Sequence, residues 1–408
     1  MSLVCRFCDE PLSHLFVDLG MSPLSNAYVR PDQLDRMESF YPLTVYVCEH
    51  CFLVQLPAAE APENIFSEYA YFSSYSESWL KHAQRYCAKM IDRLGLGPAT
   101  QVIEIASNDG YLLQYFLQAR IPVLGIEPAA NIAGVAREKG VETLVRFFGV
   151  ATANELASEG RRADLLLGNN VLAHVPDIND FVQGLRIALK PGGTVTMEFQ
   201  HLMRLMAGNQ FDTIYHEHFS YFSLLTVRQI FAANGLEIVD VEELPTHGGS
   251  LRIYAKHKGE ATPASAVVEL ERREREHGLD RLITYTSFGD RVHELKRAIL
   301  KFRIAAKEDG KHVAGYGAPA KGNTLLNYCG IRSDLIDYTV DRSPHKQGLF
   351  LPGTRIPIHA PSRIAETRPD YVLILPWNLR DEIMEQMNHI SEWGGRFAVL
   401  IPRVEVLN

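Results

Sequence analysis

Residues 101–113 read QVIEIASNDGYLL, and this stretch decides the fold. An apolar run that carries Glu104 is followed by a turn of small residues and then by the start of an apolar helix face. This order predicts a buried β-strand that leads through a tight turn into an amphipathic helix. A helix over residues 77–94, closed by the GLGP break at 95–98, should precede the strand. Most glycines of a G-x-G-x-x-G turn are replaced here, so the stretch alone is a weak signal of a dinucleotide-binding sheet.

Two later segments, residues 123–128 (VLGIEP) and 163–170 (ADLLLGNN), repeat the pattern of a short apolar run that ends at a turn. A further unit, residues 188–198 (ALKPGGTVTME), is expected to form a helix end, a glycine turn and a strand. Glu127 closes the first of these runs, about twenty positions after Glu104. A carboxylate at that place can accept hydrogen bonds from both hydroxyls of a ribose. The succession therefore predicts an α/β domain with a parallel sheet that binds an adenosyl ligand.

Four of the six cysteines form two C-x2-C pairs, Cys5 with Cys8 and Cys48 with Cys51. Each pair can offer two thiolates from one tight turn, and two pairs complete the tetrahedral sulfur site that zinc prefers. Four protein ligands leave no open coordination position, so the pattern predicts a structural zinc and not a catalytic one. A redox dithiol and unmetallated packing cysteines are the alternatives.

Residues 211–221 read FDTIYHEHFSY and place two histidines, a carboxylate and two tyrosines within seven consecutive positions. Histidine is the side chain whose ordinary pKa lies nearest neutral pH, so a histidine beside a carboxylate and phenols can act as a proton acceptor. Two other interpretations remain open. One is a polar loop whose histidines cap backbone groups, and the other is a metal site made of His216, Glu217 and His218.

The last third of the chain carries a second α/β pattern. Its strand, turn, helix and two further strands are expected over residues 312–316, 317–323, 324–329, 335–340 and 371–375. The turn, GAPAKGN, combines glycines, Lys321 and Asn323 with the start of a helix, which suits a pyrophosphate. A nicotinamide cofactor with Asp341 on its ribose is the rival ligand.

Composition limits the classes of protein to which this chain can belong. Its 408 residues suggest two or three domains, and 46% hydrophobic with 22% charged residues are typical of a soluble globular protein. A formal net charge of −8 argues against a nucleic-acid surface, because phosphate contacts need clustered lysines and arginines. The sequence has no apolar run as long as a membrane span and no signal-peptide core at its start, so we expect a cytoplasmic protein with no membrane partner.

Residues 99–255 resemble the class I S-adenosylmethionine (SAM)-dependent methyltransferases in each principal motif, including the L-x-P-G-G turn at residues 189–193. The resemblance implies a Rossmann-like methyltransferase core with SAM as its cofactor. It also implies cofactor contacts around the ends of the first three strands, by Glu104, Ala106, Asn108, Gly110, Glu127, Asn131 and Asn170.

Three more segments make the resemblance closer and extend it over essentially the whole chain. After the two cysteine pairs come, in this order, residues 69–76 (YAYFSSYS), 215–220 (YHEHFS) and 247–252 (HGGSLR). Together they resemble the sugar C-3′-methyltransferases of deoxysugar biosynthesis, which add a methyl branch beside the ketone of a nucleotide-linked 4-keto-deoxyhexose. The groups that the resemblance implies are a base, His218, and pocket-lining side chains, Tyr215, Glu217, His174 and either Tyr69 or Tyr71.

This chemistry can also be argued from the reaction. A carbon beside a ketone becomes nucleophilic only after it loses a proton, so a base and a donor to the enolate oxygen are both needed. His218 can take the proton, and His174 or a tyrosine hydroxyl can bind the enolate oxygen. Such an enzyme must also hold the nucleotide of its sugar, so we expect Lys321 and Asn323 to bind that nucleotide.

We therefore expect a zinc module over residues 1–65, a methyltransferase core over 66–258 and a C-terminal Rossmann-like domain over 259–408. Charged helices over 260–310 should connect the two sheets. The two glycines after His247 permit either a close approach to the substrate or a plain turn. The alternative functions are an NAD-dependent oxidoreductase that acts on a sugar nucleotide, and a non-catalytic zinc scaffold. The sequence predicts no particular oligomeric state.

Overall fold

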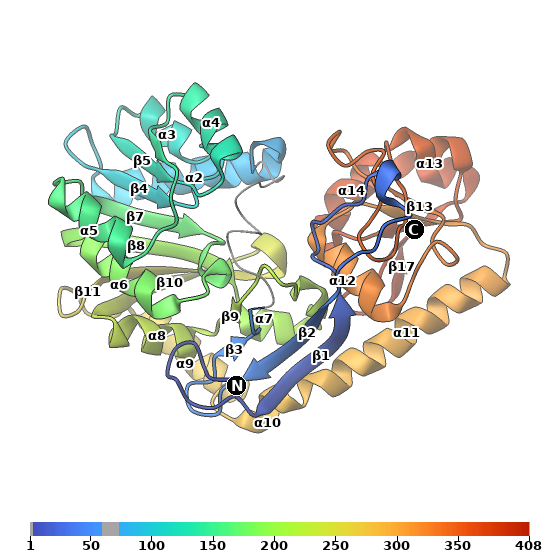
Figure 1. The fold of residues 1–408 in the computed structure, drawn as a ribbon, viewed down its shortest axis with the longest axis horizontal. Helices are drawn as coiled ribbons and strands as arrows, with labels where there is room; N and C mark the ends of the chain where they lie inside the picture. Colours follow the sequence, from blue (N-terminus) through green and yellow to red (C-terminus); the bar gives the residue numbers. More distant parts are fainter. Residues whose placement is uncertain (1–2, 59–72, 408) are drawn as a thin grey trace.

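The computed structural model describes residues 3–58 and 73–407. Within these ranges the strands form three sheets of seven, six and four strands. Figure 1 shows two lobes, one built on the seven-stranded sheet and one on the six-stranded sheet, with the N-terminal strands at the base between them. The described helices include none that is long and apolar enough to cross a membrane.

The seven-stranded sheet has the order β10-β11-β8-β7-β4-β5-β6. Its strands are β4 (Val102–Ile105), β5 (Val123–Ile126), β6 (Thr143–Leu144), β7 (Ala163–Asn169), β8 (Leu189–Gln200), β10 (Leu236–Leu244) and β11 (Ser250–His257). Strands β4 to β8 are parallel, whereas β11 runs antiparallel to both of its neighbours, β8 and the edge strand β10. Both β4 and β5 are buried over their whole length, which explains their continuous apolar sequence. The predicted parallel sheet is confirmed.

Helices pack around this sheet. They are α2 (Glu77–Leu94), α3 (Leu113–Gln118), α4 (Ala130–Glu138), α5 (Val150–Ser158), α6 (Ile178–Ala188), α7 (Leu202–Ala207) and α8 (Leu224–Ala233). Helix α2 has the predicted bounds because both ends are capped. The Ser76 hydroxyl accepts the Trp79 N–H at 3.3 Å, and Gly95 ends the helix in the left-handed conformation with φ 62°.

The four-stranded sheet has the order β1-β2-β3-β9. It is antiparallel and consists of β1 (His14–Ser22), β2 (Tyr41–Val47), β3 (Val54–Gln55) and β9 (Ser220–Tyr221). Strand β9 lies about 165 residues after β3 and closes the 211–221 segment. The N-terminal module is therefore hydrogen-bonded directly to the segment that carries the paired histidines.

Three helices, α9 (Ser265–Glu276), α10 (Leu282–Thr286) and α11 (Phe288–Glu308), lead to the second lobe. This confirms the expected helical connection, and Figure 1 shows α11 running from the base, beside the N-terminal strands, to beneath the second lobe. The six-stranded sheet has the order β14-β13-β12-β15-β16-β17. Its elements are β12 (Val313–Tyr316), α12 (Ala320–Cys329), β13 (Tyr338–Val340), β14 (Ile358–His359), α13 (Ser362–Thr367), β15 (Tyr371–Ile374), α14 (Arg380–Gln386), β16 (Arg396–Val399) and β17 (Glu405–Leu407). All neighbouring strands are parallel except β16 and β17.

Helix α12 begins at Ala320, four residues earlier than expected, so the predicted boundary is wrong. Pro319 precedes it in an extended conformation, where its fixed φ and missing N–H favour a helix start. Lys321 and Asn323 consequently lie in the first turn of the helix and not in a loop. Strand β13 is also shorter than the expected 335–340.

Candidate active site

Glu104, in β4, is 1% exposed, and neither carboxylate oxygen has a hydrogen-bond partner among the described residues. Burial raises the pKa of this carboxyl well above its ordinary value, and the charge of Glu127 adds to the rise. The Tyr111 side chain opposes the rise. A buried carboxyl without partners is costly, so this position suits a ligand that brings its own donors.

The turn after β4 has an unusual backbone. Ala106, Asn108 and Gly110 have φ values of 54°, 49° and 74°. Residues other than glycine rarely adopt this left-handed backbone region. At Gly110 a side chain is also excluded by space, because a Cβ there would lie 2.9 Å from Cγ2 of Val141. The glycine-poor sequence thus still forms a tight turn at the carboxyl end of the strand.

Glu127, directly after β5, holds the same turn. Its carboxylate accepts the backbone N–H groups of Asn108 at 3.0 Å and Ala129 at 2.9 Å. Each oxygen retains a second lone pair, which a hydroxyl can use. Asn131 lies exposed at the start of α4, and Asn170, with φ 56°, follows the end of β7. The predicted cofactor residues therefore lie at the carboxyl ends of β4, β5 and β7 or on the segments that follow these strands, and they fit an adenosyl ligand.

The paired histidines follow a short 3-10 helix, η4 (Phe211–Thr213). The ring centroid of His218 lies 4.1 Å from that of Tyr215, 4.7 Å from that of His174 and 6.0 Å from that of Tyr221. The structure therefore brings together three of the predicted catalytic residues, from two separate segments of the chain.

The Nδ1 atom of His218 lies 3.0 Å from the Thr213 carbonyl oxygen. A carbonyl only accepts, so Nδ1 carries the proton and Nε2 keeps its lone pair. Burial lowers the pKa of His218 well below its ordinary value, and the neighbouring His174 lowers it further. At neutral pH this histidine is uncharged and can act as a base.

The other members of the motif have different partners. The Nδ1 atom of His174 donates to the Glu217 carbonyl at 2.8 Å, and burial lowers the pKa of His174 to about 4. The Glu217 carboxylate accepts from Nδ2 of Asn26 at 2.6 Å, and Nε2 of His216 donates to the Pro42 carbonyl at 3.2 Å. The side chains of residues 216–218 therefore do not converge on one metal ion.

His247 has a left-handed backbone with φ 54°, and Nδ2 of Asn170 donates to its Nε2 at 3.3 Å. Burial lowers the pKa of His247 to about 4, and the charge of Lys321 adds to this effect. A Cβ at Gly248 would lie 2.3 Å from Cη2 of Trp377. The absence of a side chain at Gly248 therefore lets the Trp377 ring of the C-terminal domain pack directly against the backbone of this turn.

Lys321 is partly buried, its Nζ donates to Oδ1 of Asn378 at 2.7 Å, and it lies 4.7 Å from the centre of the Trp377 ring. Asn323 is 1% exposed and donates from Nδ2 to the Ser25 carbonyl at 2.6 Å. Asn323 therefore joins the C-terminal domain to the N-terminal module. Tyr69 and Tyr71, the other predicted pocket residues, lie outside the described residues.

Sequence reasoning missed a buried network around Glu198, in β8. Its carboxylate is 0% exposed and accepts from Nη2 of Arg252 at 2.6 Å, Nε2 of His82 at 2.9 Å and Oγ1 of Thr246 at 2.9 Å. This network joins α2, β11 and the turn that carries His247. A glutamate within a buried apolar strand was the signal available in the sequence.

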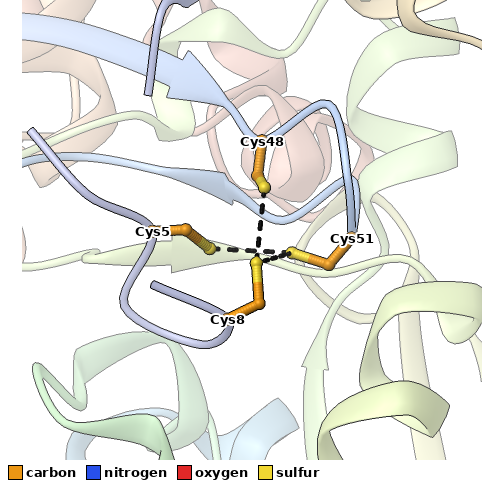
Figure 2. A group of neighbouring side chains, drawn as sticks. All are labelled: Cys5, Cys8, Cys48 and Cys51. Carbon is orange, nitrogen blue, oxygen red and sulfur yellow. Dashed lines mark hydrogen bonds between the residues drawn. The ribbon is translucent and has the colours of Figure 1, made fainter. Parts of the chain in front are cut away.

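Figure 2 shows the four cysteine side chains pointing toward a common centre. Their sulfur atoms all lie within 4.8 Å of one another, and the pairs Cys5–Cys51, Cys8–Cys48 and Cys8–Cys51 are each 3.6 Å apart. Four sulfurs at about 2.3 Å from a tetrahedral zinc would lie roughly 3.8 Å apart, so the geometry fits this ion. Nε2 of Gln55 donates to the Cys5 sulfur at 3.1 Å, as groups around metal ligands commonly do. Among the described residues, this is the one cluster of metal-ligating side chains.

The strand order, the antiparallel β11 between β8 and β10, and the acidic groups at the carboxyl end of the parallel strands define a class I SAM-dependent methyltransferase. Three family models agree with this class: "Putative zinc binding domain" matches residues 5–66, "Methyltransferase domain" 79–241 and "C-methyltransferase C-terminal domain" 245–402.

The C-methyltransferase NovU of Streptomyces niveus is 38% identical over 407 residues, which cover 99% of this chain and 96% of that protein. The chain therefore belongs to this family of C-methyltransferases. A ubiquinone biosynthesis O-methyltransferase of Rhizobium etli is 27% identical over 34% of this chain and 61% of its own length. The solved magnesium protoporphyrin IX methyltransferase of Synechocystis covers 44% of this chain and 83% of its own, with 16% identity and a TM-score of 0.35.

Proposed function

We propose that this enzyme transfers the methyl group of SAM to C-3′ of a nucleotide-linked 4-keto-deoxysugar, the carbon next to the ketone. The observation that carries the proposal is the position of His218, whose Nδ1 lies 3.0 Å from the Thr213 carbonyl oxygen and whose ring packs against Tyr215 and His174. A C-methyltransferase needs such a base, because a carbon beside a ketone reacts only as its enolate. The sugar substrate itself rests on the resemblance of the Y-H-E-H and H-G-G-S motifs.

In the proposed reaction Nε2 of His218 takes the proton from C-3′, and the electron pair of the broken C–H bond delocalises onto the ketone oxygen. Bound SAM would supply an electrophilic methyl group. The enolate carbon would form its new bond to this methyl group as the methyl–sulfur bond breaks, and the neutral thioether S-adenosylhomocysteine would leave. The donor to the enolate oxygen is Tyr215, because neutral His174 already uses its one N–H on the Glu217 carbonyl. Glu217 and His247 complete the wall of the sugar pocket.

We assign a separate role to each of three parts of the chain. We assign structural zinc to residues 1–65, SAM and the chemical step to residues 66–258, and the nucleotide of the sugar to residues 259–408. Membership in a family of C-methyltransferases favours this function over the rival one, an NAD-dependent oxidoreductase with Asp341 on the ribose.

A panel of dTDP- and GDP-linked 4-keto-deoxyhexoses, each mixed with enzyme and SAM, would test the proposal. Mass spectrometry should find one added methyl group on a panel member, and NMR of the product should place a new C–C bond at C-3′. Methyl transfer to oxygen, or to another carbon of the sugar, would contradict the assignment.

We expect Glu127→Gln to weaken SAM binding. The change keeps the size of the side chain but replaces a charged acceptor, which costs about 1.5–3 kcal/mol, or roughly ten- to hundredfold in Kd. Calorimetric titration with SAM measures this loss. Glu142→Gln, at a surface ion pair with Arg161, is the matched control and should leave the Kd unchanged. Parental affinity in Glu127→Gln would place the ribose elsewhere.

Lys321→Ala should raise the KM for the sugar nucleotide and leave the Kd for SAM unchanged, because the lysine lies in the C-terminal domain, whereas the proposed SAM ligands all lie in the core. Initial rates at varied sugar concentration and calorimetry with SAM give the two values. Lys311→Ala removes a lysine of the same domain that pairs with Asp370 at the surface, and should change neither value. Weakened SAM binding with an unchanged sugar KM would reverse the assignment of Lys321.

A further inference from the structure

The Thr213 carbonyl decides whether His218 can act as a base. A neutral imidazole carries one proton, and only the form with the proton on Nδ1 leaves Nε2 free to accept another. Thr213 is the last residue of η4, a single turn that is too short to hold its own shape. Whatever fixes η4 therefore also fixes the protonation pattern of the proposed base.

Two side chains of the C-terminal domain bind the residues on either side of Thr213. Nε1 of Trp377 donates to Oδ2 of Asp212 at 2.7 Å, and Oγ1 of Thr324 donates to the Ile214 carbonyl at 2.9 Å. Both contacts bridge more than a hundred residues of sequence, and in Figure 1 α12 lies on the side of its lobe that faces the methyltransferase core. The short helix is thus held from outside its own domain.

Burial of the Asp212 carboxylate costs desolvation free energy. Asp212 is 0% exposed, and its Oδ1 has no hydrogen-bond partner among the described residues. Burial raises its pKa to about 6, while the charge of Lys321 and the bond from Trp377 oppose the rise. A buried carboxylate adds little to stability after its desolvation, so a role in positioning explains its presence better than packing does.

The indole of Trp377 is itself held in place. The Lys321 ammonium lies 4.7 Å from its ring centre on the side of α12. On the side of the core, the ring packs so closely on Gly248 that a Cβ there would clash with it. These two contacts restrict the direction in which the indole N–H can point.

We propose that Trp377 and Thr324 are positioning residues, through which the C-terminal domain holds η4 and so keeps the Thr213 carbonyl on the Nδ1–H of His218. This inference rests on the proposed function in one respect, the role of His218 as the base. It gives the C-terminal domain a part in the chemical step beyond the binding of a nucleotide.

Two variants remove one donor each: Thr324→Val, which nearly keeps the side-chain volume, and Trp377→Phe, whose smaller ring is matched by the control below. We expect each to lower kcat about tenfold, with the sugar KM and the SAM Kd within a factor of two of the parent. The matched control is Trp393→Phe, because Nε1 of Trp393 donates to the Pro369 carbonyl at 3.0 Å elsewhere in the same domain. This control should keep the parental kcat.

Nitrogen NMR of protein labelled in histidine supplies a readout that needs no sugar. The His218 signals, identified by their loss in His218→Asn, should report a proton on Nδ1 in the parent and a mixture of both forms in Trp377→Phe and Thr324→Val. Parental kcat and an unchanged proton position in both variants would overturn the inference, as would an equal loss of kcat in Trp393→Phe. If His218→Asn keeps its turnover, the proposed base is wrong instead, so the two failures are distinguishable.

Discussion

His218→Asn should lose on the order of 10²-fold or more in turnover while both SAM and the sugar nucleotide still bind. The asparagine amide can keep the hydrogen bond to the Thr213 carbonyl, which the histidine Nδ1 makes at 3.0 Å, but it offers no basic nitrogen. The variant therefore removes the base and preserves the local structure. Initial rates of methyl transfer, with calorimetry for both ligands, measure the effect.

His216→Asn is the matched control, since His216 belongs to the same motif but contacts the Pro42 carbonyl of the N-terminal module. It should lose much less turnover. Near-normal turnover in His218→Asn would exclude His218 and leave His216, His174 or a tyrosinate as the base. Loss of solvent deuterium exchange at C-3′ in the variant would give independent support, provided that the parent exchanges this proton without SAM.

The pH dependence has a defined direction. Because burial lowers the pKa of His218, the group stays uncharged, and active, at pH values where an ordinary histidine gains a proton. The turnover rate should stay constant as the pH falls through the ordinary histidine pKa, and should decline only near the lowered pKa of His218. A decline centred at or above the ordinary histidine pKa would contradict a buried, neutral base.

The sequence predicted the fold because its determinants are local. The continuous apolar sequence of β4 and the caps of α2 at Ser76 and Gly95 depend on neighbours within a few positions. The same local rule misplaced the start of α12. The stretch GAPAKGN has the composition of a turn, yet the residues after Pro319 continue into a helix whose polar side chains contact other domains.

The candidate site was predictable where one motif carried it. His218 and Tyr215 are three positions apart, and His174 follows a recognisable strand end. The groups that hold these residues were not predictable, because their contacts join distant parts of the chain. Asn26 binds Glu217 across 191 positions, and Trp377 binds Asp212 across 165. Local patterns carry no information about such pairs, although a buried carboxylate next to a catalytic motif is a signal worth following.

Cys48→Ser should lower both the zinc content and the melting temperature of the protein. We expect about one zinc per parent chain, bound by Cys5, Cys8, Cys48 and Cys51, whose sulfurs lie within 4.8 Å of one another. A structural zinc contributes on the order of 10 kcal/mol to the folding of small domains, so the loss of one thiolate removes a large part of the stability of this module. Metal analysis and thermal unfolding measure the two effects.

Turnover should fall as well, although we assign the zinc no part in the reaction. The module reaches the active site through the pairing of β3 with β9 and through the bond from Asn26 to Glu217 at 2.6 Å. Its unfolding should therefore displace Glu217 and the segment around His218. The control is Cys87→Ser, because this buried cysteine lies outside the cluster and should leave the zinc content unchanged. Protein prepared without chelator that contains no zinc would contradict the assignment, and parental turnover in a zinc-free Cys48→Ser variant would contradict the coupling of the module to the active site.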